Sequence, residues 1–287
     1  MKDFKGKVAV ITGGANGIGF AIAEECAKRE IKIVIADINE LDLKKAEEKL
    51  KAQGAEVLAL QTDVIKYEDM ERLADKTLER FGHVDLLFNN AGVVVAGPAW
   101  SLSLRDWEWI MKVNVWGIIH GEKAFIPIML KQDTECHIIN TASAAGLLSL
   151  DGMSAYHTSK FAAVALSEST YLDLQCVTDK IKMSVFCPGF IQTDLNNCER
   201  HRPKDYDNDM EDEYYHSDSY KAKEEQKHKV IQNGIPVDMV GATIFEAIEE
   251  EKFYILTHPE INPLIGLRTR NILEGGNPSI KDIVGVK

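Results

Sequence analysis

The sequence is short of several features that would assign it to common functional classes. Positive charge is in deficit, because 33 Lys and Arg stand against 45 Asp and Glu and leave a formal net charge of −12. Such a chain repels phosphate backbones and anionic lipid, so neither nucleic acid nor a membrane surface is expected as a partner. Long hydrophobic runs are also missing: even residues 113–130 contain Asn114, His120, Glu122 and Lys123, whereas a membrane span needs about 18 apolar residues in a row.

Cysteine is scarce, and its spacing fits neither a disulfide framework nor a metal site. The five cysteines are Cys26, Cys136, Cys176, Cys187 and Cys198. They are expected to be free thiols, which are typical of a reducing compartment. The N-terminal apolar run, residues 8–11, is too short for the core of a signal peptide. No HExxH or comparable ligand set is present, so the sequence predicts a cytoplasmic protein without a metal.

What the sequence does contain is a regular alternation of short β-branched runs and helical patterns. This alternation indicates successive βαβ units, and the strands are apolar throughout because helices cover both faces of a parallel sheet. The expected strands are residues 8–12, 32–37, 56–62, 86–89, 137–141, 182–187 and 253–256. The expected helices include residues 21–29, 41–53, 159–175 and 239–250. We therefore expect an α/β fold with a doubly wound parallel sheet of about seven strands, in one domain spanning residues 1–287.

One segment interrupts this alternation. Residues 205–218 contain seven acidic residues and no Lys or Arg, and a mixed-charge helical stretch follows at 221–229. The segment is interpreted as an insertion, either a solvated surface loop or a mobile lid beside a ligand cleft, because long loops in compact domains are often functional. We expect a substrate loop or lid over residues 189–234 and a C-terminal extension over residues 258–287.

A glycine-rich turn, residues 12–19, follows the first expected strand and opens the first helix. Glycine lets the backbone turn sharply and lets a pyrophosphate approach, while the helix N-terminus presents free N–H groups to the anion. The spacing is G-x-x-x-G-x-G, and a turn that merely packs helix on strand is the alternative. The candidate cofactor contacts are Gly13, Asn16, Gly17, Ile18 and Gly19.

Asp37 ends the second expected strand, 24 residues after the first glycine of the turn. At this place a carboxylate can accept hydrogen bonds from both ribose hydroxyls of an adenosine. The carboxylate would repel a 2′-phosphate, and Asn16 and Ile38 stand where a cation could compensate, so NAD is favoured over NADP. The alternative is an Asp that caps the turn into the next helix. Asp63 and Val64 are candidates for contact with the adenine, with a turn-forming Asp63 as an equal alternative.

Tyr156 and Lys160 lie four residues apart, so both side chains lie on one face of a helix. A neighbouring cation and an oxidised nicotinamide favour phenolate, so we expect the Tyr156 pKa to fall from about 10 toward the range of a general acid and base. Ser143 follows strand 137–141 at the ligand-binding end of the sheet and can donate to a substrate carbonyl. For the Tyr and Lys alone, the alternative is a surface tyrosine packed on a lysine stem.

The order and spacing of these motifs resemble the short-chain dehydrogenase/reductase family, in its single-domain form, over residues 4–253. The motifs are residues 12–19, 89–92, Asn114, Ser143, 156–160 and 188–189. The resemblance implies a Rossmann-type fold with Asn114, Ser143, Tyr156 and Lys160 as catalytic residues, Asn114 holding a water that links Lys160 to solvent. The cofactor contacts that it adds are Asn89, Ala91, Gly92, Tyr156, Lys160, Pro188, Gly189, Ile191 and Thr193.

The resemblance also implies a mechanism and an assembly. Tyr156 takes the alcohol proton while hydride leaves the carbinol carbon for the nicotinamide, and in reduction Ser143 steadies the developing oxyanion. Family members commonly form dimers or tetramers through the helices that correspond to residues 112–131 and 156–175. A homo-oligomer is therefore expected.

The substrate is indicated less directly. Apolar residues at 146–153 precede the tyrosine, the region after the fourth strand contains Trp100, and Tyr214, Tyr215 and Tyr220 could close over a ring system. These residues favour a hydrophobic polycyclic substrate such as a hydroxysteroid or bile acid. A small polyol or acyclic hydroxy compound is the alternative. A non-catalytic NAD-sensing protein is a third reading, although it would not need both members of the Tyr/Lys pair.

Overall fold

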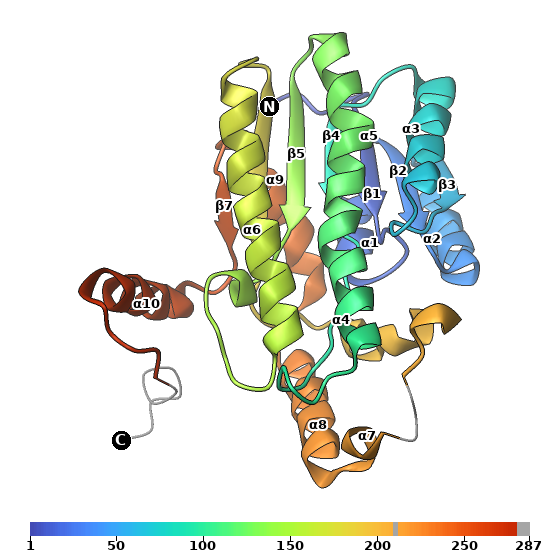
Figure 1. The fold of residues 1–287 in the computed structure, drawn as a ribbon. Helices are drawn as coiled ribbons and strands as arrows, with labels where there is room; N and C mark the ends of the chain where they lie inside the picture. Colours follow the sequence, from blue (N-terminus) through green and yellow to red (C-terminus); the bar gives the residue numbers. More distant parts are fainter. Residues whose placement is uncertain (209–211, 280–287) are drawn as a thin grey trace.

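Seven parallel strands form one sheet in the order β3-β2-β1-β4-β5-β6-β7 (Figure 1). The structure, a computed structural model, describes residues 1–208 and 212–279. The strands are β1 (Val8–Thr12), β2 (Lys32–Asp37), β3 (Val57–Gln61), β4 (Leu86–Asn89), β5 (Cys136–Thr141), β6 (Ile181–Cys187) and β7 (Tyr254–Leu256). The order changes direction between β1 and β4, where doubly wound sheets have their ligand crevice. The predicted α/β, Rossmann-type fold is confirmed.

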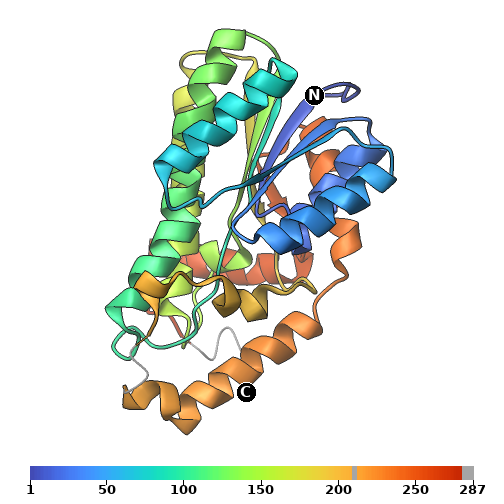
Figure 2. The ribbon, with the colours of Figure 1, turned by 90° about the vertical axis from the view of Figure 1, so that its right-hand side faces the viewer.

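Two layers of helices enclose the sheet, as the view in Figure 2 shows. On one face lie α1 (Gly17–Lys28), α2 (Glu40–Ala52) and α9 (Val240–Glu249). On the other lie α3 (Tyr67–Phe81), α4 (Leu104–Met111), α5 (Gly117–Gln132) and α6 (Ser154–Gln175). Helix α1 begins four residues before the predicted boundary at residue 21, because its first turn is built from the glycine-rich segment, which carries no apolar periodicity.

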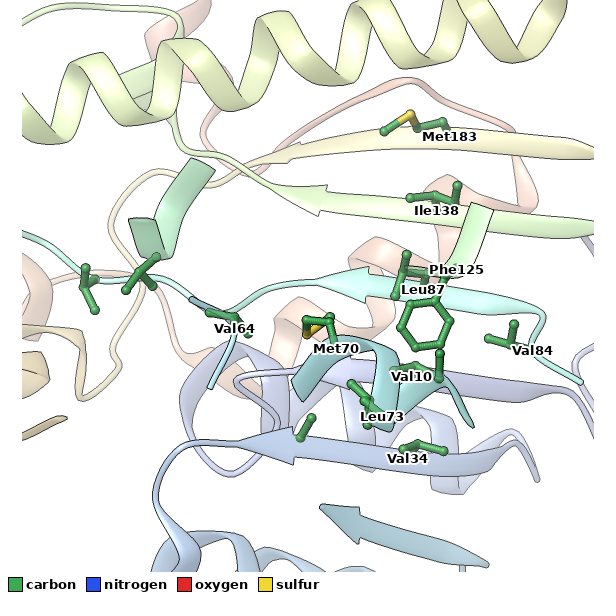
Figure 3. Close-up of a cluster of buried hydrophobic side chains, with 14 of the residues drawn as sticks. Val10, Val34, Val64, Met70, Leu73, Val84, Leu87, Phe125, Ile138 and Met183 are labelled. Carbon is green, nitrogen blue, oxygen red and sulfur yellow. The ribbon is translucent and has the colours of Figure 1, made fainter. Parts of the chain in front are cut away.

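Burial on both faces explains why the strands are predominantly apolar. Successive side chains of β1 point in opposite directions, so Val8 and Val10 join the core under α3 and α5 while Ala9 and Ile11 join the core under α1 and α9. Figure 3 shows part of the first core, where Phe125 lies over the sheet. Each large apolar side chain buried in this way contributes roughly 1.5–3 kcal/mol.

The 189–234 segment lies across the carboxyl ends of the strands (Figures 1 and 2). It contains the short helices η3 (Leu195–His201), η4 (Lys204–Tyr206) and α7 (Glu213–His216), and the longer α8 (Asp218–Gln232). After η5 (Val237–Met239), α9, β7 and η6 (Pro259–Ile261), the C-terminal extension forms α10 (Asn262–Glu274), which projects beside the sheet. Residues 209–211 of the acidic stretch and 280–287 of the extension lie outside the described residues.

The described residues bear on three sequence predictions, which concern free cysteines, a metal site and a membrane span. All five cysteines are free, and four of them are buried. Within residues 1–208 and 212–279, no group of three His, Cys, Asp or Glu is arranged to hold a metal ion. In the same part of the chain, no helix combines the length and apolar character that crossing a bilayer requires.

Glu122 on α5 is a carboxyl group buried between the helix layer and the sheet. Its two oxygens accept hydrogen bonds from Asn140 Nδ2 at 2.8 Å and from the Thr170 hydroxyl at 3.0 Å. Burial nevertheless raises the pKa of Glu122 to about 7. The folded chain therefore holds this proton more tightly than the unfolded chain does, and the associated stabilisation is lost as pH rises through about 7.

Glu122→Gln is expected to stabilise the fold at alkaline pH, because glutamine stays neutral in the same site. The free energy of unfolding should rise by up to about 3 kcal/mol at pH 8 and by under about 1 kcal/mol at pH 5. Urea unfolding at the two pH values measures both differences. Glu48→Gln, at an exposed position of α2, is the control and should show no such pH dependence. A gain for Glu122→Gln that is the same at both pH values would contradict the prediction.

Candidate active site

A cavity of about 690 Å³ extends along the carboxyl ends of the strands, with Asp37 and Tyr156 both in its wall. Its walls come from the glycine-rich turn, the loops that follow β3, β4, β5 and β6, and the 189–234 segment. Sixteen predicted site residues line it: Gly13, Asn16, Gly17, Ile18, Asp37, Asp63, Val64, Ala91, Gly92, Ser143, Tyr156, Lys160, Pro188, Gly189, Ile191 and Thr193. The fold thus brings nearly all of the candidate residues to one place.

Three candidate residues, Gly19, Asn89 and Asn114, do not line this cavity. A Cβ at Gly19 would collide with the carbonyl oxygen of Gly13, so this glycine packs helix α1 against the turn. Asn89 is 2% exposed and donates from Nδ2 to Asn140 Oδ1 at 2.9 Å. The next residue, Asn90, lines the cavity instead, because side-chain direction alternates along a strand and its extension. Spacing alone does not distinguish these two neighbours.

The glycine-rich turn has the conformation and the free N–H groups that a pyrophosphate needs. Gly13 has φ +62°, and a Cβ there would lie 2.9 Å from the Cα of Ala91, so only glycine fits. The N-cap of α1 is Asn16, whose side chain makes no hydrogen bond to the first turn and instead donates to Asp42 Oδ2 at 3.1 Å. The first N–H groups of α1 therefore lack a side-chain acceptor from the N-cap, which fits an anion-binding role.

Asp37 is held by backbone on both sides of its carboxylate. Its Oδ2 accepts from the Ala15 N–H at 3.2 Å and its Oδ1 from the Asn39 N–H at 3.1 Å. Burial raises the pKa of Asp37, with these two bonds acting in the opposite direction. The cap of α2 is not Asp37 but Asn39, whose Oδ1 accepts from the N–H groups of Leu41 and Asp42. Asp37 nevertheless caps the turn that leads into α2, through its bond from the Asn39 N–H, so this alternative is confirmed. The carboxylate also lies in the cavity wall, and its contact with a ribose stays a prediction.

Asp63 combines both roles that the sequence left open. Its Oδ1 accepts from the Ile65 N–H at 3.1 Å, which stabilises the turn after β3. The residue nevertheless lines the cavity together with Val64. A turn-forming Asp63 is thus established, and a contact with the adenine stays a prediction.

Tyr156 and Lys160 lie on one face of α6, as their spacing predicts. Lys160 Nζ is 5.7 Å from the centre of the Tyr156 ring and donates to the Thr141 carbonyl at 3.1 Å. Lys160 is 4% exposed, and burial lowers its pKa to about 8. Ser143, beyond the end of β5, lies in the same wall of the cavity. A phenol, an ammonium and a hydroxyl therefore meet at one end of the cavity.

The electrostatics of Tyr156 differ from the expectation. Burial raises the pKa of the Tyr156 phenol, and a hydrogen bond with Ser143 acts in the opposite direction without reversing the shift. The reason is that burial disfavours the charged phenolate. The chain's own residues therefore do not lower this pKa, and its fall in the presence of an oxidised nicotinamide stays a prediction.

Asn114 lies at the centre of a π-helical turn, η1 (Lys112–Trp116), that joins α4 to α5. Its Oδ1 accepts from the Val93 N–H at 2.8 Å, and its Nδ2 donates to the Val93 carbonyl at 2.9 Å and to Ser159 Oγ at 3.0 Å. Turns of this kind are frequent at functional sites. Asn114 thus ties the loop after β4 to helix α6. Its role in holding a water stays a prediction.

The substrate end of the cavity is shaped by the loop that precedes α6. The His157 ring lies between the Ala145 carbonyl, 2.8 Å from Nδ1, and the Leu150 N–H, which donates to Nε2 at 2.9 Å. His157 therefore fixes this loop and is not positioned as a base for Ser143. Leu148, Leu150 and Met153 line the cavity, as expected.

The aromatic part of the substrate prediction is wrong. Trp100 is 89% exposed and, like Tyr214, Tyr215 and Tyr220, does not line the cavity. The three tyrosine rings pack on one another, with centroids 5.3–5.5 Å apart. The residues that line the cavity instead come from α8, η6 and α10: Lys223, Gln226, Lys227, Val230, Ile231, Glu260, Ile261 and Leu264. They fall within the predicted 189–234 loop and the predicted C-terminal extension, although the sequence pattern does not single them out.

Comparison with known proteins agrees with this geometry. The family profile described as short chain dehydrogenase matches residues 7–204. A CLA biosynthesis dehydrogenase/reductase of Lactiplantibacillus plantarum is 46% identical over the full length of both chains. A 1-deoxy-11-beta-hydroxypentalenate dehydrogenase of Streptomyces avermitilis is 36% identical over 65% of this chain and 69% of its own.

Among solved structures, a short-chain dehydrogenase/reductase of Burkholderia phymatum in complex with NAD superposes with a TM-score of 0.94. It is 43% identical and covers 97% of this chain and 98% of its own. The strand order, the glycine-rich turn and the Ser143, Tyr156 and Lys160 cluster are thus explained together. This chain belongs to the short-chain dehydrogenase/reductase family of oxidoreductases.

Proposed function

We propose that this enzyme interconverts a hydrophobic secondary alcohol and the corresponding ketone. Its cofactor is NAD(H), and it acts as an NAD-dependent alcohol dehydrogenase or ketone reductase. The main support for this proposal is the set of residues that line the cavity. Ser143, Tyr156 and Lys160 line the same cavity as Leu148, Met153 and Ile231. Polar groups that can exchange a proton therefore face a largely apolar chamber.

We propose that the cofactor's adenosine ribose lies at Asp37 and its pyrophosphate at the N-terminus of α1. The bound dinucleotide supplies the hydride acceptor or donor at its nicotinamide ring. The hydroxyl of Tyr156 then exchanges the proton with the substrate oxygen, and Ser143 orients that oxygen. Lys160 places a cation behind the Tyr156 ring, at 5.7 Å. Cavity walls formed by the 189–234 segment, which we propose as a lid within a single domain, keep water from the reacting groups.

For the substrate, a polycyclic alcohol or ketone such as a hydroxysteroid or bile acid remains our first proposal. A chamber of this size accommodates a rigid ring system beside the dinucleotide, and the S. avermitilis relative is named for a hydroxypentalenate. That alignment covers 65% of this chain, whereas the L. plantarum relative, named for CLA biosynthesis, aligns with the entire chain. A small polyol or an acyclic hydroxy compound is the second candidate.

A spectrophotometric screen of NADH oxidation distinguishes these candidates. The panel contains steroid ketones, bile-acid ketones, acyclic ketones and short sugars. We expect kcat/KM for the best hydrophobic ketone to exceed that for any short sugar by about 100-fold, because burial of three or four additional methylenes has roughly this effect. Turnover of sugars alone would overturn the proposal, and equal efficiency with NADPH would contradict the role of Asp37. Tyr156→Phe is the control for adventitious reduction.

We also propose that the enzyme assembles as a dimer or tetramer. Helices α5 and α6 lie side by side (Figure 1), with Trp116 and Leu172 exposed to 52% and 60% in the single chain. Covering such side chains by a second copy is favourable, and sedimentation equilibrium measures the oligomer number. Five free thiols support our proposal of a cytoplasmic location.

A further inference from the structure

Arg200 brings a cationic side chain to the proposed adenosine end of the cavity, and His201 is its neighbour there. Both lie at the end of η3 and line the same cavity as Asp37. The Arg200 guanidinium reaches out of the 189–234 segment to helix α2, where Nη2 lies 3.4 Å from Asp42 Oδ2. Its Nη1 pairs with Asp194. No sequence pattern predicts this ion pair, because Arg200 and Asp42 are 158 positions apart in the chain.

Asp42 connects this arginine to the dinucleotide turn. The same oxygen, Oδ2, accepts from Asn16 Nδ2 at 3.1 Å, and Asn16 adjoins Ala15, whose N–H holds Asp37. The other oxygen, Oδ1, lies 3.6 Å from Lys45 Nζ, at a side chain that is 71% exposed. Asp37 lines the cavity, and Asp42 lies behind the wall, where its charge acts on Asp37 and its carboxylate pairs with Arg200.

The charge state of His201 follows from its hydrogen bond. Arg200 Nε donates to His201 Nε2 at 2.8 Å, so this nitrogen carries no proton. Burial, followed by the charge of Arg200, lowers the pKa of His201, and the ring is neutral at pH 7. The guanidinium thus faces Asp42 and Asp194, which compensate its charge and hold it in place. A 2′-phosphate at Asp37 would meet carboxylates and an arginine whose charge is already paired.

We propose that Arg200 is a cofactor-specificity residue that Asp42 keeps engaged, so that Asp42 acts beside Asp37 in excluding NADP(H). Neutralising both carboxylates removes the repulsion and releases the guanidinium toward a 2′-phosphate. This inference rests on the proposed position of the adenosine ribose at Asp37. It assigns specificity to Asp42 and Arg200, which lie outside the glycine-rich turn and the end of β2.

The test measures binding of two adenosine fragments, separately from catalysis. Isothermal titration calorimetry gives the Kd of adenosine 5′-monophosphate and of adenosine 2′,5′-bisphosphate, and their ratio reports preference for the 2′-phosphate. Asp37→Asn alone is expected to shift this ratio about tenfold toward the bisphosphate, and Asp37→Asn/Asp42→Asn about 100-fold, since each removed repulsion or gained charged hydrogen bond is worth roughly a factor of ten. The ratio of kcat/KM with NADPH and NADH should move in parallel.

A third substitution identifies the group that binds the phosphate. Adding Arg200→Gln to the double variant should return the ratio to about that of Asp37→Asn. The matched control adds Lys45→Gln, which removes the other cation at Asp42 and should leave the ratio within about twofold, because an exposed ion pair contributes little. An unchanged ratio after Arg200→Gln would overturn the inference. If Asp37→Asn alters the affinity for neither fragment, the proposed position of the ribose fails instead.

Discussion

Tyr156→Phe is expected to lower kcat by about 10²–10⁴-fold, because the variant lacks the hydroxyl that exchanges the substrate proton. The Kd for NADH should stay within about twofold, since the ring and the Lys160 side chain behind it remain. Stopped-flow absorbance gives the rate of hydride transfer in a single turnover, and NADH fluorescence titration gives the Kd. Loss of turnover with intact binding would locate the defect in the chemical step.

Tyr171→Phe is the matched control for this substitution. Tyr171 lies on the same helix and its ring packs 4.8 Å from the ring of Phe253, away from the cavity wall. Removal of this hydroxyl should leave kcat within about twofold. If Tyr156→Phe retained full activity, Tyr156 would not be the proton donor, and the role proposed for Ser143 and Lys160 around it would lose its basis.

Asp106→Ala is expected to loosen the 189–234 segment by about 3 kcal/mol, because Arg202 loses its buried partner and keeps only the more exposed Glu199. Asp106 on α4 is fully buried and accepts from Arg202 Nη2 at 2.7 Å, while the Tyr215 hydroxyl bonds its other oxygen. The Arg202 guanidinium stacks 4.2 Å from the Trp109 ring. Hydrogen exchange of the α8 amides under native conditions should accelerate about 10²–10³-fold, since each 1.4 kcal/mol is a factor of ten.

Two further variants test whether the effect comes from burial of the Asp106–Arg202 pair or from the loss of any ion pair of the segment. Lys223→Gln removes a more exposed contact of the same segment, 2.9 Å from Asp151, and should cost under about 1 kcal/mol. Asp106→Leu/Arg202→Met replaces both buried charges with apolar groups and should restore much of the protection. Equal exchange rates in Asp106→Ala and Lys223→Gln would show that burial does not strengthen the Asp106 contact.

Most of the architecture was predictable because it depends on local patterns. Burial on both faces makes each strand a short, mostly apolar run, and the seven predicted strands agree with the sheet to within one residue at each end. The Tyr156 and Lys160 pair was predictable because helical spacing alone places the two side chains on one face. Both signals are contained within a few consecutive residues.

The remaining features depend on tertiary contacts. Whether Asn89 or Asn90 faces the cavity depends on one step of alternation at the end of β4. Arg200 reaches Asp42 only because the 189–234 segment folds back across the sheet. The rise in the Tyr156 pKa depends on how much water the surrounding chain removes, which spacing does not encode. Each of these features is decided by contacts between residues that are distant in the sequence or by the burial that those contacts produce.

One continuous segment reaches both ends of the cavity: it supplies Arg200 at the adenosine end and Ile231 on α8 at the substrate end. Helix α8 also contacts η3 directly, through the hydrogen bond between Asn196 and His228. We therefore expect that displacing α8 to admit a bulkier substrate would also move η3 and Arg200. Laboratory evolution of α8 toward new substrates should then alter the residence time of NAD(H), so substrate range and cofactor retention are best selected together.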